Sequence, residues 1–397
     1  MIENHSHTAF PLRGLISLYG GGTPSKDNPD YWGGDIPWAS VKDLKADGLN
    51  KTQDTITYLG LDNSASKLVE AGSLIIATRM AVGKVAIAEF DVAINQDLKA
   101  IVCQSNLDVR YLFYYLFSLE KYFNRVSSGA TVKGIKINHI LDIEIPLPPL
   151  PKQQKIAAIL DAANSLRQKD QQLIDKYNEL SQSLFLDMFG DLVSNEYGFE
   201  IGTIRDLLDS ANYGTSAKAQ GDGEYPYLRM NNITYKGEMD FGSLKYINLD
   251  DKDKPKFLAQ RGDLLFNRTN SRELVGKTGL YNEEKGMAIA GYLVRARTNE
   301  KANPYFIWAY MNSKHGKLVL KHMCKSIVGM ANINAQEFQN IKILLPPIDL
   351  QNQFAERIQA IEQQKQQAQA SLQKSEDLFN SLLQRAFKGE LTQNMAA

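Results

Sequence analysis

Small, hydroxyl-bearing and cationic residues gather in two short stretches of this sequence, 20–26 (GGGTPSK) and 213–218 (YGTSAK). Glycine lets a backbone approach another molecule closely, while hydroxyls, lysines and exposed N–H groups bond phosphate oxygens. Ordinary turns use the same residue types, so the recurrence of the pattern is what favours binding. The candidate residues are Gly22, Thr23, Ser25, Lys26, Thr215, Ser216 and Lys218.

A second group of polar residues has the chemistry to read base edges or bind phosphates. Asn can bridge N6 and N7 of adenine, and Arg can bridge O6 and N7 of guanine. Any one of these residues could equally be a solvated strand end. The candidates are Lys42, Arg79, Lys84, Lys133, Lys136, Arg229, Asn231, Asn232, Arg268, Arg272 and Lys277.

Signatures of catalysis are incomplete. VGKTG (275–279) is similar to a nucleotide-binding P-loop, but Ser271 stands where the first glycine is required. His322 and Cys324 make at most half a metal site. Asp263 with Glu283 has generic spacing, and both proline pairs follow Leu rather than the Asn or Asp of an amino-methyltransferase motif. The sequence therefore predicts a chain without catalytic activity, metal or cofactor.

The candidate residues recur because the chain contains a tandem duplication. Displacing IEIPLPPLPKQQ (143–154) by 198 residues places it on IKILLPPIDLQN (341–352), with Gln153 on Gln351. Upstream, the comparison pairs Gly22 with Gly214 and Thr23 with Thr215. Each PP pair precedes a long helical stretch, and prolines suit the first turn of a helix. The order is head, helix, head, helix.

Apolar residues in both helical stretches follow alternating three- and four-residue steps, which predicts an antiparallel coiled coil between the two copies. A single amphipathic helix lying on a globular core is the alternative. Asp170 and Lys365 interrupt the apolar seams. Two alternatives are open for them: they set the register of the helix pair, or they face a gap or solvent. The seam residues are Ile156, Ile159, Ala163, Leu166, Leu173, Tyr177, Leu180 and Leu184, then Phe354, Ile358, Ile361, Ala368, Leu372, Phe379, Leu382 and Ala386.

Short β-branched or aromatic runs cut by Gly, Asn and Asp predict strands within each head. They are 36–40, 74–77, 84–88, 225–229, 263–266 and 292–297, and one helix is expected at 108–126 and at 303–325. The expected fold class is α+β, with two α+β heads (1–150 and 193–347) joined by two long antiparallel helices (151–192 and 348–397) in a pseudo-two-fold repeat.

Composition gives broad limits. The formal net charge is zero, so any DNA affinity has to come from clustered loop cations. No apolar run reaches the length of about 18 residues that spans a membrane, and the N-terminus lacks a signal-peptide layout. Two cysteines form no disulfide framework. We expect a cytoplasmic protein without a membrane partner.

The order head–PLPPLPKQQ–helix–head–LLPPIDLQN–helix, with PDYWGGDIPWASVKDL and INQDL in the first head, resembles the specificity subunit of type I restriction–modification systems. The resemblance covers nearly the whole chain. It implies two target-recognition domains, each reading half of a split, asymmetric site in double-stranded DNA, held apart by the two helices.

The same resemblance implies partners and cofactors. Two methyltransferase subunits dock on the helices and bind S-adenosylmethionine, and two restriction subunits, which are translocase-endonucleases, use ATP and Mg. The specificity subunit itself is not catalytic. The main alternative is a coiled-coil interaction scaffold whose heads bind proteins or glycans and not DNA; a self-contained nuclease or methyltransferase lacks the motifs its chemistry needs.

Overall fold

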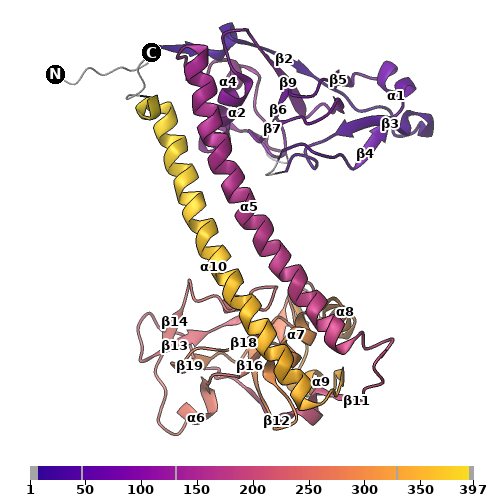
Figure 1. Cartoon of the computed structure of the whole chain (residues 1–397), viewed down its shortest axis with the longest axis vertical. Coiled ribbons are helices and arrows are strands. Elements are labelled where there is room, and N and C mark those ends of the chain that lie inside the picture. Colours follow the sequence, from indigo (N-terminus) through magenta and orange to yellow (C-terminus); the bar gives the residue numbers. More distant parts are fainter. Residues whose placement is uncertain (1–7, 46–47, 130–131, 328–329, 393–397) are drawn as a thin grey trace, which may run out of the picture. The chain divides into compact units, whose positions relative to one another are not determined.

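The structure is a computed structural model that describes residues 8–45, 48–129, 132–327 and 330–392. The chain divides into two compact units, each drawn with labelled elements in Figure 1. Unit 1 comprises Met1–Gln172 and Gln369–Ala397, and unit 2 comprises Leu173–Ala368. Each unit therefore contains one head, the first part of one long helix and the last part of the other.

Head 1 contains two four-stranded sheets, β2-β9-β6-β7 and β4-β3-β8-β5, and the pair β1-β10. All strand pairs are antiparallel except β3 with β8. The strands are β1 Ala9–Pro11, β2 Ile16–Gly20, β3 Trp32–Ala39, β4 Asp54–Ile56, β5 Lys67–Val69, β6 Leu74–Ala77, β7 Val85–Ile87, β8 Val92–Ile94, β9 Leu98–Cys103 and β10 Glu144–Pro146. The helices are α1 Tyr58–Asp62, α2 Val109–Ser118, α3 Glu120–Val126, α4 Asn138–Leu141 and the long α5 Leu150–Phe189.

Head 2 repeats this plan with sheets β12-β20-β16-β18 and β14-β13-β19-β15, the pair β11-β23 and an added sheet β17-β22-β21. The strands are β11 Ile201–Thr203, β12 Leu208–Tyr213, β13 Tyr225–Leu228, β14 Lys245–Ile247, β15 Leu258–Ala259, β16 Leu264–Asn267, β17 Thr269–Asn270, β18 Thr278–Leu280, β19 Met287–Ile289, β20 Leu293–Thr298, β21 Lys325–Ile327, β22 Met330–Asn332 and β23 Lys342–Leu344. The helices are α6 Lys254–Phe257, α7 Pro304–Asn312, α8 Lys314–Met323, α9 Ala335–Gln339 and the long α10 Ile348–Phe387. The expected α+β class and the six expected strands are confirmed.

The single helix expected in each head is two helices. In head 2, α7 ends before Ser313, whose hydroxyl caps α8 by accepting from the N–H of Gly316 at 3.1 Å. A Cβ on Gly316 would lie 2.2 Å from the carbonyl oxygen of Tyr310, so only glycine allows this tight turn. In head 1 the break falls at Leu119, between α2 and α3.

The long helices pack on the heads and on each other within each unit. In unit 1, Ile156 and Leu160 of α5 share one core with Phe379 and Leu383 of α10 and with α2. In unit 2, Phe185 of α5 shares a core with Phe354 and Ile358 of α10 and with α7. The start of one helix meets the end of the other in each unit, so the predicted antiparallel pairing is confirmed.

The seam predicted for α10 is largely buried, but part of the seam predicted for α5 was wrong. Leu166, Leu173 and Leu180 are between 41% and 49% exposed. The buried positions of α5 include the predicted Ile156 and Ala163 and also Gln153, Ala157, Leu160, Asp170, Ile174, Phe185, Met188 and Phe189. Periodicity marks an apolar face without showing which partner covers it, and here the three leucines lie beside the seam.

The two polar seam residues are both buried. In unit 1, Oδ1 of Asp170 accepts from the hydroxyl of Ser371, 3.2 Å away on α10. In unit 2, Nζ of Lys365 lies 2.5 Å from Glu238 Oε1 in head 2 and 3.5 Å from Glu362 Oε1. Neither residue faces solvent, so the solvent alternative was wrong. Asp170 links the two helices, and Lys365 links α10 to its head.

A buried glutamine joins each head to its long helix in the same way. In unit 1, Oε1 of Gln153 accepts from the N–H of Asp108 at 2.8 Å, and Nε2 donates to the carbonyls of Asn106 and Pro148. In unit 2, Gln351 accepts from the N–H of Asn303 at 2.9 Å and donates to two carbonyls, one of them on Pro346. Asp108 and Asn303 are the N-caps of α2 and α7. The joint is therefore duplicated bond for bond.

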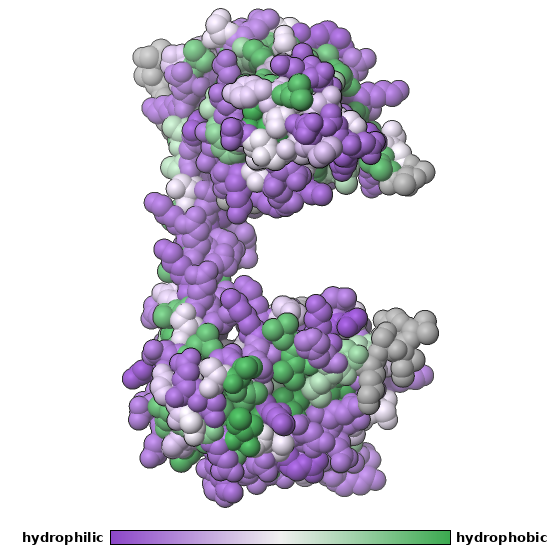
Figure 2. Space-filling model, turned by 90° about the vertical axis from the view of Figure 1, so that its right-hand side faces the viewer, coloured by the Kyte–Doolittle hydropathy of each residue, from purple (hydrophilic) through white to green (hydrophobic). Residues whose placement is uncertain are grey.

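The surface fits this assignment of the core. On the side shown in Figure 2 each unit is mostly hydrophilic, and apolar side chains gather in patches on unit 2. None of the helices in the described parts of the chain is long and apolar enough to cross a membrane.

Candidate nucleic-acid interface

The predicted phosphate-binding loops follow β2 in head 1 and β12 in head 2, and the same bonds hold both. Trp38 Nε1 donates to the carbonyl of Gly22 at 3.1 Å, and the hydroxyl of Tyr227 donates to the carbonyl of Thr215 at 2.9 Å. The N–H groups of Gly22 and Thr215 donate to carbonyls at the ends of β8 and β19. Gly22 therefore corresponds to Thr215, and the predicted pairing of Gly22 with Gly214 was shifted by one residue.

Close packing explains the glycines of these loops. A Cβ on Gly21 would lie 1.7 Å from the carbonyl oxygen of Ile94, and a Cβ on Gly214 would lie 2.3 Å from that of Ile289. Gly22 is itself buried, and a Cβ there would meet Ala65 at 2.7 Å. These glycines let the loops pack into the heads, while Thr23, Ser25, Lys26, Ser216 and Lys218 lie at the surface or partly exposed.

Head 1 has a cavity of about 600 Å³ beside this loop. Three predicted residues line it, Thr23, Lys26 and Lys42. The hydroxyl of Thr23 donates to Oε1 of Gln96 at 2.5 Å, and this bond ties the first loop to the turn after β8. The other lining residues are Trp32, Trp38, Ser40, Val41, Asp54, Met80, Asn95, Gln96 and Asp97. Sequence reasoning missed these because they are dispersed over the chain and follow no short motif.

Met80 lines this cavity, and Arg79 forms an ion pair with Asp97, another of its lining residues. Asp97 is 8% exposed, and its Oδ1 accepts no hydrogen bond but lies 3.4 Å from Nη1 of Arg79. Met80 has φ +64° and is 66% exposed. That left-handed conformation costs an L-residue about 1–2 kcal/mol, and such strain concentrates at functional sites. The N–H of Met80 donates to the carbonyl of Lys133 at 3.0 Å, which places Lys133 beside Arg79.

Three predicted residues of head 2 lie in and beside a turn after β13. The side-chain oxygen of Asn232 accepts from the N–H of Arg229 at 2.9 Å, and its amide donates to the carbonyl of Asp240. Asn232 is 1% exposed, so it shapes the turn from inside. Asn231 is exposed, and Arg229 donates through Nη2 to the carbonyl of Ser243 while its Nε has no partner.

The run Asn267–Arg272 places two further arginines, Arg268 and Arg272, on head 2. The guanidinium of Arg268 lies 4.8 Å from the ring centroid of Tyr213, and its Nε has no hydrogen-bond partner. Arg272 is exposed. Thr269 and Asn270 form β17 of a three-stranded sheet, where head 1 has only the isolated antiparallel bridges Arg79–Gly134 and Ser128–Gly134 in its described residues. The two heads therefore differ in the side chains and in the extent of strand pairing at these predicted DNA-binding turns.

The matched lysines Lys84 and Lys277 bond main-chain carbonyls. Nζ of Lys277 donates to Met230 at 2.7 Å and to Ile233 at 2.5 Å, and Nζ of Lys84 donates to the carbonyl of Leu44. Lys277 is 7% exposed, and burial lowers its pKa. Both lysines tie β7 or β18 to the turn after β3 or β13. Lys136 is exposed on the segment before α4.

No group of three or more His, Cys, Asp or Glu residues that could hold a metal ion occurs in the part of the chain that the structure describes. The two heads share one design, and each is fused to a long helix. Their corresponding turns present different cations and amides, so together they define a duplicated recognition protein. The chain belongs to the family described as type I restriction modification DNA specificity domain, whose model matches residues 7–176 and again 196–374.

Individual relatives agree with this family. The MjaIX specificity subunit of Methanocaldococcus jannaschii is 24% identical over 96% of this chain and 92% of its own length. The EcoR124I/EcoR124II specificity subunit of Escherichia coli is 31% identical over 44% of this chain and 45% of its own length. A type I S subunit from M. genitalium has the same fold, with a TM-score of 0.61 at 15% identity and 98% of both chains covered.

The protein is thus a DNA specificity subunit of a type I restriction–modification system, the non-catalytic component of the complex, whose cofactors are bound by the modification and restriction subunits. The expected family, fold and function are confirmed. The alternative of a scaffold that does not bind DNA is excluded by the family assignment.

Proposed function

We propose that head 1 (about residues 1–150) and head 2 (about 193–347) each read one half of a bipartite, asymmetric site in double-stranded DNA. The observation that carries this proposal is that the same bonds hold the turns of both heads, whereas the side chains that these turns present differ between the heads. The Trp38–Gly22 and Tyr227–Thr215 bonds keep the loops alike. Lys42 lines the cavity of head 1, whereas Asn231 and Arg229 stand after the corresponding strand of head 2. One scaffold with two sets of base-competent groups fits an unequal pair of half-sites.

The candidate residues divide into two roles by burial, except that exposed Lys84 is placed by its bond to the carbonyl of Leu44. Exposed or partly exposed side chains are proposed to contact phosphates or bases; they are Thr23, Ser25, Lys26, Lys42, Arg79, Lys133, Lys136, Ser216, Lys218, Arg229, Asn231, Arg268 and Arg272. The others bond main-chain groups beneath the loops and are proposed to position them; they are Gly22, Lys84, Thr215, Asn232 and Lys277.

Met80 joins the first group. Its apolar side chain is exposed between Arg79 and the cavity, in a conformation that the fold holds against strain. Methionine is among the apolar side chains that insert between base steps. We assign Met80 to the bases of the first half-site and Arg79, held by Asp97, to the adjoining backbone.

The two long helices (151–192 and 348–397) are proposed to fix the spacer between half-sites and to dock two methyltransferase subunits. Leu166, Leu173 and Leu180 support the docking role, because seven-residue spacing of exposed leucines on α5 forms a stripe suited to a partner helix. In the assembled complex these subunits hold S-adenosylmethionine, two restriction subunits supply the ATP- and Mg-dependent activity, and the complex acts in the cytoplasm.

Methylome sequencing of a host that carries this chain with its methyltransferase partner tests the proposal. It should return one split motif of two unlike halves with a constant spacer. Asn231→Ala should relax bases of one half and leave the other intact, and Lys42→Ala should do the reverse. Loss of both halves in either variant, or an uninterrupted motif in the wild type, would contradict the division of the two heads.

A further inference from the structure

Unit 2 contains a cavity of about 660 Å³ where head 2 meets the long helices. Its apolar walls come from four elements and include Phe185 of α5, Trp308 of α7, Leu318 of α8 and Ile358 of α10. The volume lies within the range of about 300–1,000 Å³ typical of small-molecule sites. None of the candidate DNA-binding residues is among those that line it.

The duplication shows how the lining of this cavity departs from the corresponding part of unit 1. Phe379 of unit 1 is buried, with its ring centroid 6.0 Å from that of Tyr114 and 5.9 Å from that of Phe117. A displacement of 198 residues places Ser181 of unit 2 at the position of Phe379. On α7, Ala309 and Asn312 stand where α2 carries the two aromatic residues. Three aromatic rings are thus replaced by three small side chains, and Ser181, Ala309 and Asn312 all line the cavity.

The charge around this cavity is one-sided. Its lining includes one acidic residue, Glu362, and five lysines, which are Lys236, Lys314, Lys317, Lys321 and Lys365. Of these, Lys365 is paired with Glu238 and Glu362. Three lysines of α8 follow one another at three- and four-residue steps, so they share a helix face.

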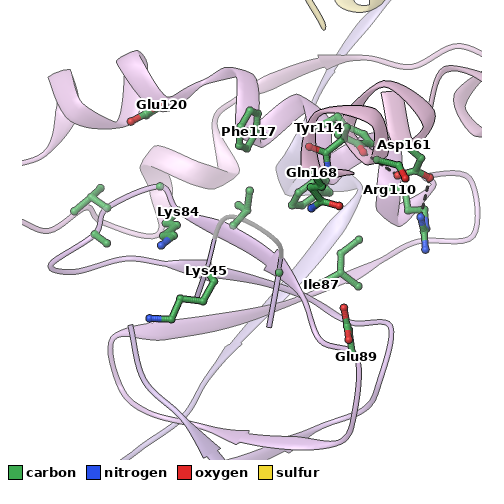
Figure 3. Close-up of a pocket in the computed structure, with 18 of the residues that line it drawn as sticks. Lys45, Lys84, Ile87, Glu89, Arg110, Tyr114, Phe117, Glu120, Asp161 and Gln168 are labelled. Carbon is green, nitrogen blue, oxygen red and sulfur yellow. Dashed lines mark hydrogen bonds and ion pairs between the residues drawn. The ribbon is translucent and has the colours of Figure 1, made fainter. Parts of the chain in front are cut away.

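The corresponding junction of unit 1 is balanced instead. Its cavity of about 700 Å³, shown in Figure 3, has equal numbers of acidic and basic lining residues. They are Glu89, Glu120, Asp161, Lys45, Lys84 and Arg110. Arg110 donates to Asp161 at 2.7 Å, which neutralises both groups. The excess of positive charge is therefore a property of unit 2 and does not follow from the shared design.

Two polar groups in the lining of the unit 2 cavity have unused or poorly solvated donors. Nδ2 of Asn178 is buried and has no hydrogen-bond partner. Lys317 donates to Oδ1 of Asn312 at 2.9 Å, and its ammonium lies 4.9 Å from the ring centroid of Tyr235. Burial, with a smaller effect of Lys277, lowers the pKa of Lys317 to about 8. A ligand with acceptor oxygens would satisfy Asn178 and offset the burial of Lys317.

We propose that this cavity binds a small amphipathic organic anion, with an aromatic or branched apolar body against Phe185, Trp308 and Ile358 and a carboxylate, sulfonate or phosphate group near Lys317 and Asn178. A free small molecule fits this space because its volume is that of a small-molecule site and its lining comes from both long helices and the head within one unit. The proposal is independent of the half-site assignment.

The test measures binding of 8-anilinonaphthalene-1-sulfonate to the full-length chain by fluorescence and calorimetry. N-phenyl-1-naphthylamine, which has the same rings without the sulfonate, is the neutral comparison probe. The sulfonate probe should bind one equivalent per chain. Lys317→Gln should weaken it by about tenfold and leave the neutral probe unchanged. Ser181→Phe, which supplies the ring present in unit 1, should abolish binding of both probes.

Lys176→Gln, an exposed change elsewhere on α5, is the matched charge control and should alter neither probe. A cooperative thermal transition at or above the wild-type temperature shows that Lys317→Gln is folded. Full binding in Ser181→Phe would place the probe elsewhere and overturn the proposal, as would equal binding of both probes with no effect of Lys317→Gln. Loss of binding when methyltransferase subunits join the chain would show that a protein segment fills the cavity, and this too would overturn it.

Discussion

Lengthening both long helices by four residues tests whether they set the spacer of the DNA site. The insertions belong where the compact units meet along the chain, between Gln172 and Leu173 in α5 and between Ala368 and Gln369 in α10. Four residues add about 6 Å and about 40° beyond a full helical turn. One base-pair step rises about 3.4 Å and turns about 35°.

The added rotation therefore matches about one base pair, and the added length is at most about 1.8 base pairs. We expect the methylated motif to keep both half-sites and to lengthen its spacer by one or two base pairs. Seven added residues give about 10.5 Å, close to three base pairs, but the helix then falls about 20° short of two turns while DNA turns about 105°. That variant should lose most methylation.

Methylome sequencing after each insertion gives the spacer and the half-sites together. The matched control places the same four residues after Glu196, in the exposed connection between α5 and β11, and should leave the motif unchanged. Full methylation with the original spacer, or altered half-sites with the original spacer, would refute the idea that helix length sets the distance.

Three further changes have expected outcomes. Lys365→Met leaves Glu238 and Glu362 without their partner and should lower the free energy of unfolding by about 3 kcal/mol in urea titrations, with part of the loss restored by adding Glu238→Gln. An unchanged midpoint would show that this ion pair contributes nothing. Met80→Gly should raise the free energy of unfolding by up to about 1 kcal/mol because it relieves the left-handed strain. The same change should weaken DNA binding by the assembled methyltransferase in a gel-shift titration. An increase in both stability and DNA affinity would remove Met80 from the interface. Lys317→Met should be more stable than wild type at pH 7. This difference in stability should shrink between about pH 8 and 10.5, because there the unfolded wild-type chain binds more protons than the folded one. A difference in unfolding free energy that stays constant with pH, measured by denaturation, would contradict the lowered pKa.

Local chemistry made much of the fold predictable. The proline pairs before α5 and α10 mark helix starts because their fixed φ and missing N–H suit the first turn. β-Branched runs such as Leu74–Ala77 became buried strands. The duplicated Gln153 and Gln351 were visible as a match, but their bonds to Asp108 and Asn303 were not, because they join residues 45 and 48 positions apart.

The wrong predictions came from sequence patterns that do not show which part of the structure each residue packs against. The leucines at 166, 173 and 180 have heptad spacing, but only the packed structure shows that they lie outside the seam. The helix breaks at Leu119 and Ser313 depend on a cap and a tight turn within otherwise helical runs. Lys365, a polar seam residue, forms an ion pair with Glu238, which is distant in sequence and lies on a loop of head 2.

For the candidate site, the sequence shows which residue types lie on loops but not the burial on which their proposed roles depend. Lysines and asparagines on loops were found, but burial separates Asn232 and Lys277 from exposed Asn231. Met80 carries no sequence signal of its own, since its left-handed backbone is imposed by the bond to Lys133. Gln96 and Asp97 reach the cavity of head 1 only because β8 lies beside β3.

The paired glutamines at the helix starts have a consequence for how new targets arise. Each uses one amide and main-chain atoms to fix the angle at which a head leaves its helix, and no loop side chain takes part. Loop sequences can drift freely without disturbing that angle. In the proposed function, the bases that a head contacts can therefore change while the angle between that head and its helix stays the same. A host lineage can then change the recognised DNA sequence by substitutions in one small region at a time.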